Sequence, residues 1–160
     1  MKKQILDAIQ KNGRYSTEDL AAMLATDEQT IKKEIKEMED ANVICGYPTL
    51  INWDQTDCEL VTALIEVKVT PQRNMGFNKV AERIYRFEEV ESVYLMSGGF
   101  DLTVVIQGKS MKEVARFVSE KLSTLESVNS TSTYFVLKKY KDHGVIFQTP
   151  SQDERLVIAP

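Results

Sequence analysis

The sequence contains few of the residues that build catalytic and metal centres. Its 160 residues include one histidine and two cysteines. Cys45 and Cys58 lack the spacing of metal ligands and lie far from His143 in the sequence, so we expect free thiols, no metal site and no cofactor. We find neither a nucleophile–base pair nor a phosphate-binding loop, and we therefore expect that the chain is not an enzyme.

Long apolar runs are missing as well. No stretch approaches the roughly 18 consecutive apolar residues of a membrane span, and Asp7 falls where a secretory signal would continue its apolar run. We expect a cytoplasmic protein with no membrane partner. Apolar residues make up 42% of the chain and charged residues 28%, which is typical of folded domains, and the length allows two small ones.

An excess of positive charge is also absent. The chain has a net charge of −4, and residues 1–50 carry seven basic against nine acidic side chains. Overall charge therefore does not favour binding to nucleic acid. Any contact with DNA must come from one oriented face.

Three helices are predicted within the first fifty residues. The first spans residues 3–12 and ends at an Asn-Gly pair. The second begins at Ser16, because Ser16 and Asp19 fit the capping-box pattern. The third begins with a second such pattern at residues 26–29, so the turn between the last two helices is very short. That spacing is typical of a helix-turn-helix.

The third helix has one apolar and one polar side. Ile31, Ile35 and Met38 recur at helical spacing, so Lys33 and Lys36 lie on the opposite, solvent-facing side. The residues that we expect to contact DNA are Ser16, Gln29, Thr30, Lys32, Lys33 and Lys36. Taken alone, a three-helix unit of this size can equally be a packing or protein-interaction module.

Asn42 follows the third helix at a position that favours a left-handed residue. Residues 43–52 then read as a strand that leads into a second domain. We expect Trp53 to anchor the linker by packing rather than to stack on a ligand.

The second domain reads as strand, helix, strand, strand, helix, strand. Alternating apolar residues predict strands at 61–69, 90–96, 102–106 and 131–138, and helical stripes lie at 77–87 and 111–125. Two βαβ halves joined by a tight hairpin form a ferredoxin-like sandwich with both helices on one sheet face.

The expected fold class is therefore α+β. It comprises a winged-type helix-turn-helix (1–46), a linker strand and hinge (47–59), a ferredoxin-like βαββαβ domain (60–140) and a tail with possible edge strands (141–160).

The second face of this sheet has no helix to cover it. Its strands carry apolar residues there, and an apolar face of that size requires a partner, most simply a second copy related by a two-fold axis. The predicted dimer interface consists of Leu64, Tyr94, Val105, Tyr134 and Val136.

In the order of its parts, the chain resembles the Lrp/AsnC family of feast/famine regulators. The resemblance rests on the helix-turn-helix, the phrase Asn-Val-Ile-Cys-Gly-Tyr at 42–47, the βαββαβ domain, and Ser-Gly-Gly-Phe-Asp at 97–101 between its second and third strands. It spans residues 1–140. The chain departs from the family pattern at Glu34, where arginine is usual, and at Asn42, where glycine is usual.

The resemblance implies a sequence-specific DNA-binding transcriptional regulator whose assembly or DNA affinity responds to a free amino acid. It implies a homodimer formed through the sheets and linker strands, which assembles further into a tetramer or octamer and binds double-stranded DNA. The expected effector-binding residues are Met96, Ser97, Gly98, Gly99, Phe100, Asp101, Thr131 and Thr133.

The turn at 97–101 suits such a ligand chemically. Its backbone N–H groups can bind a carboxylate, and Asp101 can accept from an ammonium group. We also expect Gly98 and Gly99 to supply positive φ in the hairpin. The alternative function is an ACT-like amino-acid-binding module that acts through protein partners without DNA.

Overall fold

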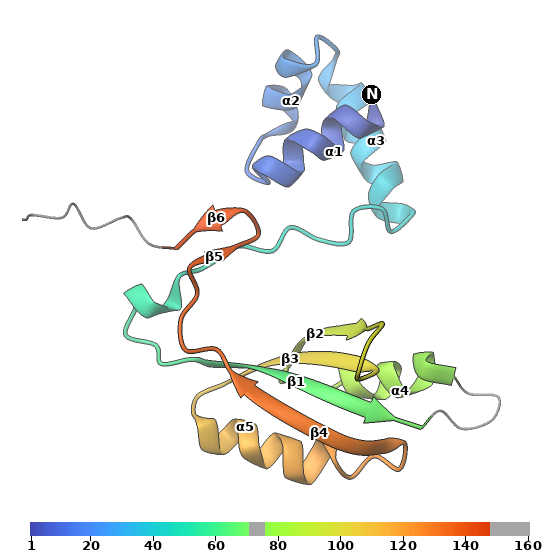
Figure 1. Cartoon of the computed structure of the whole chain (residues 1–160). Helices are drawn as coiled ribbons and strands as arrows, with labels where there is room; N and C mark the ends of the chain where they lie inside the picture. The colour runs from blue at the N-terminus through green and yellow to red at the C-terminus, as the bar shows by residue number, and fades with distance from the viewer. Residues whose placement is uncertain (71–75, 148–160) are drawn as a thin grey trace, which may run out of the picture. The chain divides into compact units, whose positions relative to one another are not determined.

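The computed structural model describes residues 1–70 and 76–147. The chain divides into two compact units, Met1–Leu50 and Ile51–Pro160 (Figure 1). This division separates the helix-turn-helix from the domain that contains the sheet.

The N-terminal unit consists of three helices. They are α1 (Lys2–Lys11), α2 (Thr17–Met23) and α3 (Glu28–Asp40). Its core is formed by the buried side chains Ile5, Leu20, Ala21, Ile31, Met38 and Ile44. The predicted helix-turn-helix is confirmed, but residues 1–50 contain no strand, so the wing expected of a winged-type unit is absent from them.

Side-chain caps fix where α2 and α3 begin. Ser16 Oγ accepts from the Asp19 N–H (3.0 Å) and Asp19 Oδ2 accepts from the Ser16 N–H (2.9 Å), so the predicted capping box is confirmed. The second predicted box is wrong: Asp27 caps α3 by accepting from the Thr30 N–H (2.8 Å). The Thr26 N–H is already bonded to Ala21 O, in the last turn of α2, so it is not available for the second bond of a capping box.

The turn between α2 and α3 requires a left-handed residue. Ala25 has φ +49°, its N–H donates to Ala22 O, and the next N–H, that of Thr26, donates to Ala21 O. This pair of bonds is a Schellman motif, whose left-handed position favours glycine because a Cβ is strained there. The same motif ends α3 at Asn42, with φ +54°, as predicted.

Residues 43–52 do not form the expected strand. A strand requires a neighbour for its backbone N–H and C=O groups, and the described part of the chain offers this segment none. The chain instead reaches a single 3₁₀ turn, Trp53–Gln55.

The C-terminal unit is a four-stranded antiparallel sheet in the order β2-β3-β1-β4. Its elements are β1 (Val61–Val69), α4 (Gly76–Tyr85), β2 (Val90–Leu95), β3 (Leu102–Gly108), α5 (Met111–Phe117), which continues into a π turn (Val118–Leu122), and β4 (Val128–Phe135). This is the predicted βαββαβ order. The fourth strand has the predicted length but lies three residues earlier than the predicted 131–138, because its register with β1 pairs Val69 with Val128 and Ala63 with Phe135.

The core of this unit lies between the sheet and its two helices (Figure 1). From β1 and β3, the alternate residues Ala63, Ile65, Val67, Val69, Leu102, Val104 and Ile106 are buried against Val80, Ile84, Val114, Phe117 and Leu122. Both helices therefore cover one face of the sheet, as predicted.

After β4 the chain forms a short hairpin of β5 (Lys141–Asp142) and β6 (Val145–Ile146). His143 and Gly144 have positive φ at its turn. The tail was expected to supply edge strands, but β5 and β6 pair with each other and do not extend the four-stranded sheet. The second candidate, at 156–158, lies outside the described residues.

We expect Ala25→Gly to raise the free energy of unfolding of the N-terminal unit by up to about 1 kcal/mol. Glycine removes the left-handed strain, and its larger unfolded-state entropy offsets part of the gain. The matched control is Ala22→Gly within α2, which should lower stability by about 1 kcal/mol. Thermal unfolding followed by helical circular dichroism measures the direction of both changes in stability. A lower stability for both variants would contradict the idea that Ala25 is strained.

Candidate functional site

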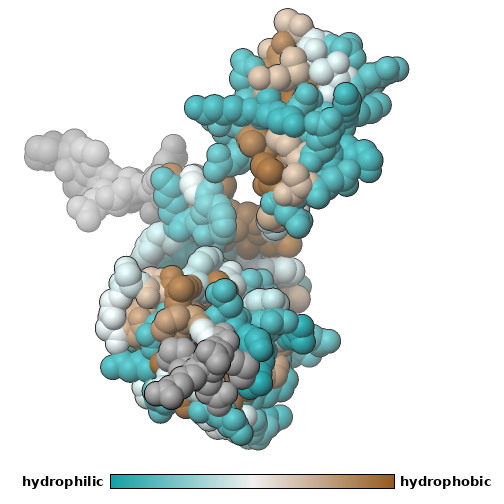
Figure 2. Space-filling model, turned by 90° about the vertical axis from the view of Figure 1, so that its right-hand side faces the viewer, coloured by the Kyte–Doolittle hydropathy of each residue, from teal (hydrophilic) through white to brown (hydrophobic). Residues whose placement is uncertain are grey.

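Helix α3 presents the side chains predicted to contact DNA. Gln29, Lys32, Lys33 and Lys36 are exposed, and the opposite side of the helix places Ile31 and Met38 in the core. Hydrophilic side chains dominate the face of this unit that Figure 2 shows. The structure thus gathers these four predicted residues on one solvent-facing surface.

The three lysines of α3 differ in how tightly acids hold them. Lys32 Nζ lies 2.8 Å from Glu28, whereas Lys33 lies 4.0 Å from Glu37 and Lys36 lies 3.8 Å from Asp40. The shorter pair has its acid one turn before the lysine, which is the better order on a helix. Exposed pairs of this kind contribute little, so a phosphate can replace the acid at Lys33 and Lys36.

Two of the predicted DNA-contacting residues have structural tasks. Ser16 Oγ accepts the cap bond of α2 and also donates to Asp19 Oδ2 (2.8 Å). Thr30 is half-buried, and its hydroxyl donates to Asp27 Oδ2 (2.6 Å). Both lie near helix N-termini, where backbone contacts to phosphate are also favoured.

Acidic residues of α3 have partners outside the helix that the sequence did not reveal. Lys2 Nζ lies 2.9 Å from Glu37 Oε2 and 3.6 Å from Glu34 Oε2. The hydrogen bond from Lys2 lowers the pKa of Glu37. Thr17 Oγ1 donates to Glu28 Oε1 (2.5 Å). The members of each pair are at least eleven positions apart in the sequence, so no local spacing signals them.

The loop between β2 and β3 contains the motif at 97–101. The Asp101 carboxylate accepts from the Val69 N–H (2.9 Å), and the Asp101 N–H donates to Val67 O (3.0 Å). The Met96 N–H donates to Asp101 O (2.8 Å). Asp101 therefore joins the loop to the end of β1, while residues 96–99 remain exposed.

The expected role of Gly98 and Gly99 as positive-φ hairpin residues is wrong. Neither has positive φ, and a Cβ added at either would meet nothing within 4 Å. The connection from Leu95 to Leu102 is a six-residue loop rather than a two-residue turn. A longer loop reverses the chain without left-handed residues.

Thr131 and Thr133 lie on the edge strand of the sheet. Thr131 pairs with Val67 and Thr133 with Ile65, so both point to the helix-covered face. Val67 also pairs with Leu102, the residue after the 97–101 loop. Thr131 therefore lies at the same end of the sheet as Asp101, with β1 between them.

The uncovered face of the sheet combines an apolar and a polar row. Tyr134, Leu64 and Val105 stand side by side across three strands, and the next row is Ser132, Glu66, Thr103 and Tyr94. The face is less apolar than the sequence suggested. Leu64 is nevertheless 40% exposed, Tyr94 55% and Tyr134 53%.

Val136 lies just beyond β4. Its N–H donates to Thr62 O (2.9 Å), which extends the pairing with β1 by one residue. By alternation its side chain is on the same face as Tyr134. The structure thus places the five residues of the predicted dimer interface on one side of the sheet.

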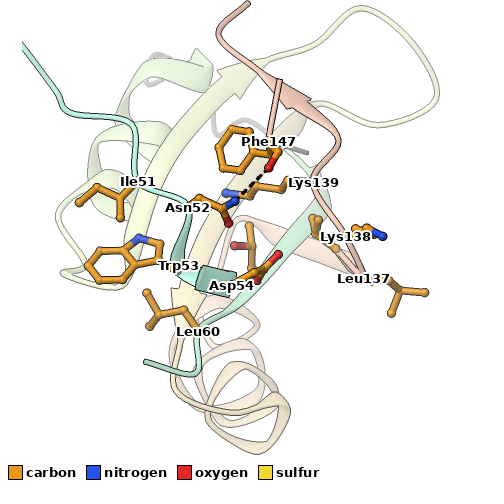
Figure 3. Close-up of a pocket in the computed structure, with 11 residues that line it drawn as sticks. Ile51, Asn52, Trp53, Asp54, Leu60, Leu137, Lys138, Lys139 and Phe147 are labelled. Atoms are coloured by element: carbon orange, nitrogen blue, oxygen red, sulfur yellow. Dashed lines mark hydrogen bonds between the residues drawn. The ribbon is translucent and has the colours of Figure 1, made fainter. Parts of the chain in front are cut away.

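Trp53 is one of the residues that line a pocket of the C-terminal unit (Figure 3). The pocket lies between the 3₁₀ turn and the chain that follows β4, and the Asn52 side chain donates to Phe147 O (3.1 Å) across it. Trp53 is half-buried there, and its packing role stays a prediction.

Within residues 1–70 and 76–147, no helix is both long and apolar enough to cross a bilayer. In the same ranges, no three side chains of histidine, cysteine or acidic residues come together where a metal ion could bind.

Each of the two units matches a known domain family. Residues 62–146 match the Lrp/AsnC ligand binding domain, and residues 1–44 match a winged helix-turn-helix DNA-binding domain. The chain belongs to the Lrp/AsnC family. It is a DNA-binding helix-turn-helix transcriptional regulator of this family, and its role is regulatory rather than catalytic.

Lrp/AsnC relatives match nearly the whole chain. An uncharacterized HTH-type transcriptional regulator, YugG, of Bacillus subtilis is 53% identical over 98% of this chain and 95% of its own. The leucine-responsive regulatory protein of Haemophilus influenzae is 28% identical over 86% of this chain and 82% of its own.

Solved Lrp/AsnC structures share the fold. A transcriptional regulator of Neisseria meningitidis, solved as a complex with L-Met, has a TM-score of 0.70 at 24% identity, over 88% of this chain and 90% of that chain. The leucine response regulatory protein of Mycobacterium tuberculosis has a TM-score of 0.75 at 18% identity, over 92% and 97%.

Proposed function

We propose that this Lrp/AsnC chain binds specific promoter sequences as a homodimer or a higher assembly, and that a free amino acid modulates its assembly or DNA affinity. The observation that carries the proposal is the exposed row Gln29, Lys33 and Lys36 on α3, the second helix of the helix-turn-helix. In this motif the second helix enters the major groove, and base contacts come mainly from its N-terminal part.

The position of the residues along α3 suits this use. Gln29 lies in the first turn, where an amide side chain can read a base edge. Lys33 and Lys36 follow on the same face and suit phosphate oxygens. The acids Glu39 and Asp40 fall in the last turn, away from the end that reads bases. The match of residues 1–44 to a DNA-binding domain argues against the ACT-like alternative.

Assembly is proposed through the uncovered sheet face and the linker. Leu64, Val105 and Tyr134 form an exposed or half-exposed apolar row that a second copy can cover. No strand of the described chain pairs with residues 43–52, although the N–H groups of Val43 and Ile44 bond to Met38 O at the end of α3. A two-fold partner can pair with the rest of the segment. Dimers of this kind present two recognition helices, as palindromic operators require.

An amino-acid effector is proposed at the 97–101 loop. The structural relative from Neisseria meningitidis contains L-Met. The loop exposes backbone N–H groups for a carboxylate, and one Asp101 oxygen remains to accept from an ammonium group while the other holds Val69. Action on DNA implies an intracellular protein, and we propose the cytoplasm.

We expect Lys33→Ala and Lys36→Ala each to weaken DNA binding, because each removes a phosphate contact. The salt dependence of binding should flatten by about one unit of slope per contact. Fluorescence anisotropy with a duplex selected from random-sequence DNA measures both quantities. Lys112→Ala on α5 removes the same charge from the other unit and should change neither. Wild-type affinity and slope in both α3 variants would place the DNA-binding face elsewhere.

We expect Val105→Asp to dissociate the assembly, because dimerisation would bury an unpaired carboxylate at a cost of several kcal/mol. Sedimentation analysis of the full chain at micromolar concentration measures the mass. Ala115→Asp, on the exposed side of α5, makes a similar change away from the sheet and should leave the mass unaltered. A wild-type chain that is monomeric under these conditions refutes the interface.

We expect Asp101→Asn to weaken effector binding by about 1.5 to 3 kcal/mol, the value of a charge-assisted hydrogen bond. Asparagine can still accept from the Val69 N–H, so the loop should keep its shape. Calorimetry with the amino acid that most raises the melting temperature of the wild type measures the loss, and Glu91→Gln is the charge control. Equal affinities would move the site, and an unfolded variant would make Asp101 structural.

A further inference from the structure

Every acidic side chain of the recognition helix has a polar partner. Helix α3 carries five acids and three lysines. Besides the pairs already described for Glu28, Glu34, Glu37 and Asp40, Glu39 accepts from the Tyr47 hydroxyl (2.8 Å). An acidic helix can approach phosphate only if these charges are neutralised or turned aside. Lys2 on α1 engages two of the five at once.

Glu37 lies between two competing lysines. Its Oε2 is 2.9 Å from Lys2 Nζ, and its Oε1 is 4.0 Å from Lys33 Nζ. The shorter contact is the hydrogen bond, so Lys2 is the partner that holds this carboxylate. Lys33 is left with a weak, longer pair, and its side chain is 76% exposed.

Glu34 is neutralised from the same side. Its side chain is 24% exposed, and Oε2 is buried without a hydrogen bond among the described residues. Lys2, at 3.6 Å, is its ion-pair partner in that part of the chain. Glu34 therefore points toward α1 rather than across the surface that carries Lys33 and Lys36.

We propose that Lys2 is a positioning residue for DNA binding: it draws Glu37 and Glu34 toward α1 and leaves Lys33 free to bind phosphate. Lys2 itself need not touch DNA. This inference rests on the proposed docking of α3. Without Lys2, Glu37 has Lys33 as its remaining partner one turn away, and the helix loses a phosphate contact while two acids lose their counterion.

The raised pKa of Lys2 agrees with this arrangement, and its largest cause is the hydrogen bond to Glu37. The pair is exposed, so it contributes little to folding stability. The pair affects DNA binding more than folding stability, because every charge on this surface adds to the electrostatic potential that the DNA phosphates meet.

The test uses the full chain and a fluorescein-labelled duplex selected from random-sequence DNA with the wild type. We expect Lys2→Gln to weaken binding roughly three- to tenfold and to flatten the salt slope by about one unit. Lys2→Arg should restore the wild-type values. Lys3→Gln is the matched control, because it removes the same charge one residue away, from a side chain that has no ion pair or hydrogen bond with residues 1–70 or 76–147.

The Glu37 variants separate positioning from a merely structural role. Glu37→Gln should tighten binding, because Lys33 then has no acid to pair with. Combined with Lys2→Gln, it should return the affinity to within about twofold of the wild type. If Lys2 only held α1 against α3, the double variant would bind as weakly as Lys2→Gln or more so.

Each result bears on one hypothesis. A wild type without salt-dependent DNA binding would refute the proposed function itself. If the wild type binds DNA and Lys2→Gln binds with the same affinity, the role of Lys2 is overturned. The same holds if Lys3→Gln loses as much affinity as Lys2→Gln. Circular dichroism of each variant verifies the fold, and if Lys2→Gln does not fold, the affinity of Glu37→Gln decides: unchanged or weaker binding overturns the proposal.

Discussion

Strand β1 is paired along both of its edges, and the C-terminal unit depends on that pairing. It bonds to β3 on one side and β4 on the other, and its alternate residues Ala63, Ile65 and Val67 are fully buried under the helices. Because side chains alternate, the same strand places Leu64 and Glu66 on the uncovered face. Asp101 also binds at the end of β1, so the register of this strand positions the core, the uncovered face and the 97–101 loop together.

The N-terminal unit meets a different constraint, which is electrostatic. A helix with more acids than lysines is a poor polyanion ligand by charge alone. Here the acids are engaged by partners from other parts of the unit, Lys2, Thr17 and Tyr47, or by lysines of the helix itself. Net charge is therefore a weak guide to this surface, since orientation decides which charges reach solvent freely.

Several features were predictable because their causes are local. The capping box at Ser16, the left-handed residue at Asn42 and the alternating core residues of β1 and β3 each follow from contacts within a few residues or from strand periodicity. Where two causes competed, prediction failed. The Thr26 N–H closes α2 and is not available to a capping box, so Asp27 caps α3 instead. Strand β4 lies three residues earlier than predicted, because its pairing with β1 sets its position.

The sequence by itself determined the order of elements, the two-unit organisation and the exposed lysines of α3, because periodicity and capping are written in short stretches of chain. Only the tertiary structure decided that Lys2 meets Glu34 and Glu37, that Asp101 binds the Val69 backbone, and that residues 43–52 find no strand partner in the described chain. The physical reason is the sequence distance between the partners. The side-chain contacts join residues more than thirty positions apart, and residues 43–52 lack a neighbouring strand in the described chain. No local sequence pattern predicts either feature.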